Sequence, residues 1–87
     1  MEKLKNKILW VDDEIELLRS NILFLEDKGY FVEKATNGED AVDMVKEKDF
    51  DLIFLDEMMA GMGGLKTLAS IKEVQPNVPV VMVTKNE

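Results

Sequence analysis

Two apolar runs constrain this chain most, because each is short, uninterrupted and followed at once by acidic residues. Ile8–Val11 runs into Asp12 and Asp13, and Leu52–Leu55 runs into Asp56. Runs of this kind, separated by a helical pattern, are typical of central strands in a parallel sheet that is covered on both faces. If the two strands are neighbours, their three carboxylates converge at the carboxyl edge of the sheet, where open α/β sheets bind ligands.

Three carboxylates at one edge need compensation, because like charges packed together repel one another. A hard divalent cation such as Mg²⁺ is the usual solution, since it prefers oxygen ligands. The chain contains no Cys and no His, so a thiolate metal site is excluded and acid–base chemistry falls to carboxylates, Lys or Thr. The sequence therefore predicts a magnesium site.

Strand-like and helix-like segments alternate along the rest of the chain. The expected strands are residues 7–11, 30–35, 51–55 and 80–83, and the expected helices are residues 13–28, 39–48 and 65–74. This order implies right-handed parallel crossovers and a doubly wound α/β sheet. Glu33 and Lys34 in the strand 30–35 suit an edge position.

Capping residues and apolar periodicity place the helices more closely. Asp13 is the expected N-cap of the first helix and Gly29 its C-terminal stop, while Asn37 is expected to cap the second. The residues expected to face inward are Ile15, Leu18, Ile22 and Leu25, widened by Leu17 and Phe24, then Ala41, Val42 and Val45, then Leu65, Leu68 and Ile71.

Length and charge limit the function classes. Eighty-seven residues allow a single domain, and eleven basic against eighteen acidic residues give a net charge of −7. That sign argues against direct binding to nucleic acid or to anionic membranes. No segment has the length and apolarity of a membrane span or a signal peptide, so a cytoplasmic location is expected.

Three motifs carry a family resemblance. They are Asp12-Asp13-Glu14 after a strand, Leu55-Asp56-Glu57-Met58-Met59 followed by Gly61-Met62-Gly63-Gly64-Leu65, and Val83-Thr84 at the end of the last strand. In this order and spacing they resemble the CheY-like receiver domain of two-component response regulators, over essentially the whole chain. The amino-acid sequences of these motifs are also similar to those of receivers that are fused to an alkaline-phosphatase-like PglZ domain.

The resemblance implies a flavodoxin-like sheet with strand order 2-1-3-4 and a role for each motif residue. Asp56 would be the phosphoacceptor, a carboxylate nucleophile that forms an acyl phosphate. Asp13 would bind Mg²⁺ directly and Asp12 mainly through water, with Asp56 and the backbone carbonyl of Met58 completing the protein ligands. Thr84 would be the switch hydroxyl that turns toward the phosphoryl group. The phosphodonor would be a histidine kinase or a phosphotransfer protein, and the chain itself no enzyme beyond Mg²⁺-assisted self-phosphorylation and dephosphorylation.

The family pattern extends beyond this sequence. A complete receiver continues through a further helix, strand and helix, roughly 30 more residues, and brings a Lys that pairs with the acceptor carboxylate. We therefore expect residues 1–87 to form a single, C-terminally shortened receiver. The fourth strand would be an open edge and the first helix would lose a neighbour, so we expect a homo-oligomer through these two surfaces.

Three other functions remain open on the residues alone. A haloacid-dehalogenase-like phosphatase would need an acidic residue two positions after Asp56, where this chain has Met58. A flavin-binding module would need a phosphate loop rich in Gly and hydroxyl groups after the first strand, where Asp12 and Asp13 stand. An interaction or dimerisation module without efficient phosphorylation is the strongest alternative, because the partner Lys is missing.

Overall fold

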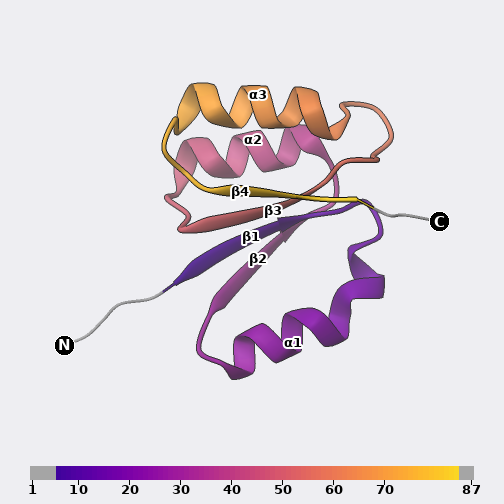
Figure 1. Cartoon of the computed structure of the whole chain (residues 1–87), viewed down its shortest axis with the longest axis vertical. Coiled ribbons are helices and arrows are strands. Elements are labelled where there is room, and N and C mark those ends of the chain that lie inside the picture. Colours follow the sequence, from indigo (N-terminus) through magenta and orange to yellow (C-terminus); the bar gives the residue numbers. More distant parts are fainter. Residues whose placement is uncertain (1–5, 85–87) are drawn as a thin grey trace.

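A parallel sheet of four strands forms the centre of the molecule (Figure 1). The computed structural model describes residues 6–84. Its strands are β1 (Lys7–Val11), β2 (Phe31–Ala35), β3 (Leu52–Asp56) and β4 (Val80–Val83), and its helices are the 3₁₀ turn η1 (Ile15–Leu18), α1 (Arg19–Asp27), α2 (Gly38–Glu47) and α3 (Gly64–Val74). The strand order is β2-β1-β3-β4, and every pair is parallel. The predicted flavodoxin-like, doubly wound arrangement is confirmed.

Helices cover both faces of the sheet, which explains why β1 is apolar from Ile8 to Val11 and β3 from Leu52 to Leu55. Figure 1 shows α2 and α3 side by side over one face and α1 over the other. The larger core lies under α2 and α3 and includes Leu9, Ile53 and Ile71, none of which is exposed. A smaller core under α1 contains Trp10 and Ile22, and the Trp10 ring packs at 4.6 Å, centroid to centroid, on Phe54.

The first helix begins differently from the sequence prediction. Residues 15–18 form a 3₁₀ turn, and α1 starts only at Arg19. Asp13 is not the N-cap: Oδ1 of Asp12 instead accepts the backbone N–H of Glu14 at 2.8 Å. The buried Asp12 thus makes the local turn, and Asp13 is left exposed at the sheet edge. Gly29 ends the segment with φ of +101°, as the sequence predicted.

Three residues that were expected inside lie at the surface. Leu17, Phe24 and Leu65 are 76%, 61% and 66% exposed. The 3₁₀ turn has about three residues per turn, so it shifts the phase of the apolar stripe in α1, which is centred on Ile22. In α3 the buried residues are Gly64, Thr67 and Ile71, so this helix is rotated away from Leu65.

The predicted cap of the second helix and the predicted edge strand are confirmed. Asn37 caps α2, because its Oδ1 accepts the backbone N–H of Asp40 at 2.8 Å. Ala41 and Val45 are buried beneath that helix. At the β2 edge Glu33 forms an ion pair with Lys48 at 2.7 Å, while β4 is the opposite edge of the described sheet. No helix between residues 6 and 84 is long and apolar enough to cross a membrane.

Candidate metal centre

The three carboxylates predicted to meet do so. One oxygen from each of Asp12, Asp13 and Asp56 lies within 4.8 Å of the others. The strand register explains why the carboxylates lie together. Val11 of β1 pairs with Leu55 of β3, so the residues that follow them, Asp12 and Asp56, lie at the same edge of the sheet. Asp12 and Asp56 are 1% and 0% exposed, whereas Asp13 is open to solvent.

Backbone hydrogen bonds hold the two buried carboxylates in place. Oδ1 of Asp12 accepts the N–H of Glu14 at 2.8 Å, and Oδ1 of Asp56 accepts the N–H of Met58 at 3.0 Å. Sheet hydrogen bonding also continues past the strand ends, since the Glu57 N–H donates to the Val83 carbonyl at 3.0 Å. The side chains are therefore fixed by the sheet and by the first turn of each loop.

This donor set fits Mg²⁺. All three side chains offer carboxylate oxygens, which hard cations prefer over nitrogen or sulfur ligands. Mg²⁺ retains several water molecules when it is bound to protein, and the exposed position of Asp13 leaves one side of the cluster accessible to water. The chemistry of the residues and their placement at a strand-end edge both suit this ion.

The two remaining predicted site residues lie at the same edge. Met58 follows Asp56 by two positions and is 67% exposed. Because a thioether is a soft ligand that suits Mg²⁺ poorly, the atom of Met58 that could contribute to the metal is its backbone carbonyl oxygen. Thr84 follows Val83, the residue of β4 that pairs with Asp56, and it is exposed. The metal contact of the Met58 carbonyl and the switching role of the Thr84 hydroxyl stay predictions.

Sequence reasoning missed three residues that support this edge. Gly64 was placed in a loop and its neighbour Thr67 was given no role, yet both are buried at the start of α3. Gly38, which begins α2, packs directly against Thr67. The available signal was a Gly at the first position of each helix, because a good helix former is expected there unless another chain segment approaches closely.

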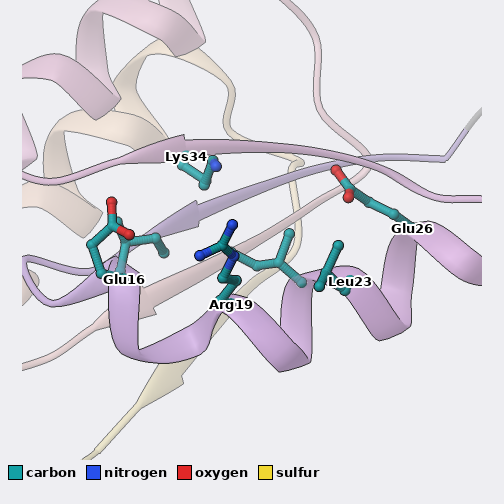
Figure 2. Close-up of a pocket in the computed structure, with 7 residues that line it drawn as sticks. Glu16, Arg19, Leu23, Glu26 and Lys34 are labelled. Atoms are coloured by element: carbon teal, nitrogen blue, oxygen red, sulfur yellow. The ribbon is translucent and has the colours of Figure 1, made fainter.

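A second hollow lies between α1 and β2, away from the carboxylate cluster. Figure 2 shows Arg19 pointing from α1 toward β2, where Lys34 lies, with Glu16 and Glu26 on either side. The hollow has a volume of about 310 Å³. Its mixture of basic and acidic groups does not form a set of cation ligands, so the carboxylate cluster at the sheet edge is the candidate metal centre.

Solved structures with the same fold define the class of protein. The chemotaxis protein CheY4 of Vibrio cholerae superposes with a TM-score of 0.87 at 29% identity, over 97% of this chain and 72% of that one. The response regulator TrrA of Thermotoga maritima, solved in complex with Mg²⁺-BeF, gives a TM-score of 0.85 at 29% identity, over 94% and 71%. The fold is thus that of CheY-like response regulators.

Sequence comparison identifies the family. The model of the response regulator receiver domain matches residues 8–87, and the chain belongs to this family. It is 43% identical to the transcriptional regulatory protein ZraR of Klebsiella oxytoca, over 88% of this chain and 17% of that protein. It is also 43% identical to a CpxR homologue of Haemophilus influenzae, over 91% and 34%. The chain spans about a sixth to a third of these relatives. Receiver domains are signalling modules that interact with histidine kinases.

Proposed function

We propose that this receiver domain accepts a phosphoryl group on Asp56 with the help of Mg²⁺. The observation that carries the proposal is the cluster of Asp12, Asp13 and Asp56 at the carboxyl edge of β1 and β3. Two further facts support it. The chain belongs to the receiver family, and the related TrrA was solved with Mg²⁺-BeF.

In the proposed reaction a carboxylate oxygen of Asp56 attacks the phosphorus of the donor. A new P–O bond forms an acyl phosphate, and the P–N bond to a phosphohistidine of a kinase or phosphotransfer protein breaks, leaving its imidazole. The Met58 N–H, which donates to Oδ1 of Asp56, holds the nucleophile in a fixed orientation. Mg²⁺, when bound, supplies positive charge that offsets repulsion between the carboxylate and the phosphoryl oxygens.

Asp12 and Asp13 have different parts in this scheme. Asp13 is exposed and would hold the metal directly, while the buried Asp12 would act mainly through a water ligand. The Met58 carbonyl would add a backbone ligand. Thr84 would donate a hydrogen bond to a phosphoryl oxygen and draw the end of β4 inward, which is how the signal would leave the site.

A labelling experiment tests the proposal. The chain is incubated with phosphoramidate, with Mg²⁺ or with EDTA, and its intact mass is measured. We expect one added phosphoryl group in Mg²⁺ only, and none on Asp56→Asn. Asp51→Asn is the matched control, because Asp51 directly precedes the same strand at its opposite end. Label that persists on Asp56→Asn, or no label on the wild-type chain, would contradict the proposal. The second outcome favours an interaction module without phosphorylation.

We further propose that the 87-residue chain self-associates. β4 forms one edge of the described sheet, and Val81 on it is 44% exposed. Phe24 on α1 is 61% exposed on the same side of the sheet as Trp10 and Phe54. An open edge beside apolar surface invites pairing with a second copy. Analytical ultracentrifugation should show a dimer that Val81→Lys weakens. A monomer at all concentrations would contradict this proposal without affecting the phosphorylation site.

Membership of the receiver family supports a proposal for the location and the wider role. Phosphotransfer from a kinase would take place in the cytoplasm, and the net charge of −7 disfavours direct binding of this chain to DNA. ZraR and the CpxR homologue are transcriptional regulators of which this chain matches only a part. A DNA-binding output would therefore reside outside the matched region.

A further inference from the structure

We propose that Gly64 is a positioning residue for the metal centre, an inference that rests on the proposed function. It holds the first turn of α3 against the backbone that follows the phosphoacceptor. By this contact the turn fixes the loop that carries Met58. Gly64 touches neither metal nor phosphoryl group, so its effect passes through Glu57 and Met58.

The space at Gly64 excludes any side chain. A Cβ atom built there would lie 2.5 Å from the carbonyl oxygen of Asp56 and 2.7 Å from Cα of Glu57. Both are backbone atoms, so no rotamer change can relieve the clash. The Gly64 N–H also donates to the Glu57 carbonyl at 3.3 Å. Even a methyl group would therefore push α3 and the Asp56–Glu57 backbone apart.

Displacement of the Glu57 backbone would move the adjacent residue of the site, Met58. The next residue, Met58, donates its N–H to Oδ1 of Asp56 at 3.0 Å, and its carbonyl is the proposed metal ligand. A shift of the backbone at Glu57 thus changes both the orientation of the Asp56 carboxylate and the position of that carbonyl. Misplacement of a ligand by small amounts weakens metal binding, because Mg²⁺ demands near-ideal octahedral geometry.

A buried contact between two helices braces the same turn. Thr67 is 0% exposed, and both its N–H and its hydroxyl donate to the Gly63 carbonyl at 2.9 Å. Gly38, at the start of α2, lies so close that a Cβ there would clash with Oγ1 of Thr67. The α2 backbone therefore sits behind the turn of α3 and limits its movement away from Asp56.

The decisive comparison is Gly64→Ala with Gly63→Ala. Gly63 is the preceding residue, has an ordinary φ of −69°, and a Cβ there would meet nothing within 4 Å. Two readouts are used on folded protein: the Mg²⁺ dissociation constant by calorimetry, and the amide chemical shifts of Glu57 and Met58 without metal. We expect Gly64→Ala to weaken Mg²⁺ binding by about tenfold or more and to move both amide shifts. Gly63→Ala should stay within about twofold of the wild-type chain, since its methyl group meets no atom within 4 Å and the carbonyl that accepts from Thr67 is kept.

The outcomes separate this inference from the proposed function. Wild-type affinity and unchanged shifts in Gly64→Ala would overturn the positioning role while leaving the phosphorylation site intact. Absence of Mg²⁺ binding by the wild-type chain would instead refute the proposed function, and the metal-free shifts would still test the contact.

If Gly64→Ala does not fold, Thr67→Val and Thr67→Ser replace it. Thr67→Val, which loses the hydroxyl, should weaken Mg²⁺ binding several-fold. Thr67→Ser, which keeps it, should not, and equal affinities would overturn the proposal.

Discussion

Asp12, directly after β1, and Asp56, the last residue of the neighbouring β3, share one local geometry: Oδ1 of each accepts the backbone N–H of the residue two positions later. Both carboxylates are almost completely buried. Burial of two like-charged groups at one edge disfavours folding unless another interaction at the site offsets their desolvation and repulsion. The pair therefore makes sense as part of a cation site, with the exposed Asp13 completing it.

Removal of the exposed carboxylate should separate metal binding from stability. Asp13→Asn is a surface change, so in EDTA its free energy of unfolding should stay within about 0.5 kcal/mol of the wild-type value. At Mg²⁺ a hundred times the dissociation constant, the wild-type chain should gain about 2.7 kcal/mol, and the variant should lose most of that gain. Urea unfolding with and without Mg²⁺ measures both quantities. Asp27→Asn, at the far end of α1, serves as a control that keeps the full gain.

The cap of α2 should contribute measurably to stability. Asn37→Ala removes the acceptor of the Asp40 N–H and should lower the free energy of unfolding by about 1 kcal/mol. Asn37→Ser should retain most of it, because a hydroxyl oxygen can accept the same bond. Asn77→Ala, in the exposed turn before β4, is the control. Equal denaturation midpoints for the two Ala variants would contradict the capping role.

The close approach of α2 to α3 should appear as energetic coupling. Gly38→Ala forces a Cβ toward Oγ1 of Thr67, and Thr67→Ala removes that oxygen. Each single variant should be destabilised, but the double variant should be more stable than the sum predicts by about 1 kcal/mol. A double-mutant cycle measured by chemical denaturation gives the coupling. Additive effects within about 0.3 kcal/mol would mean that the helices tolerate a wider separation.

Trp10 should be unusually tolerant of one substitution. Its Nε1 is buried and has no hydrogen-bond partner among residues 6–84, so its N–H carries a desolvation cost. Trp10→Phe removes that group and keeps an aromatic ring against Phe54. We expect it to change the free energy of unfolding by less than about 1.5 kcal/mol, whereas Trp10→Ala should cost about 3 kcal/mol or more. Thermal unfolding followed by circular dichroism distinguishes the two, and a loss of about 3 kcal/mol in Trp10→Phe would contradict the expectation.

The sequence alone determined which segments form strands and which carboxylates follow them, whereas the strand order came from the family resemblance. Apolar runs that lead into Asp12, Asp13 and Asp56 report local facts, namely strand length and the residue at each strand end. Capping by Asn37 and the stop at Gly29 are local as well, because each depends on a few neighbouring backbone groups. Such features depend on residues that are close in the sequence and not on how the helices pack, which is why they could be predicted.

Only the tertiary structure decided how the helices are rotated and what supports the site. Leu65 is exposed and Thr67 buried because Gly64 seats α3 on the backbone of Asp56 and Glu57. That contact joins segments whose approach no periodicity encodes, and it rests on the absence of a side chain, which leaves no apolar signal in the sequence. Close packing across the sheet edge, rather than hydrophobic pattern, fixed the final geometry of the loop after Asp56.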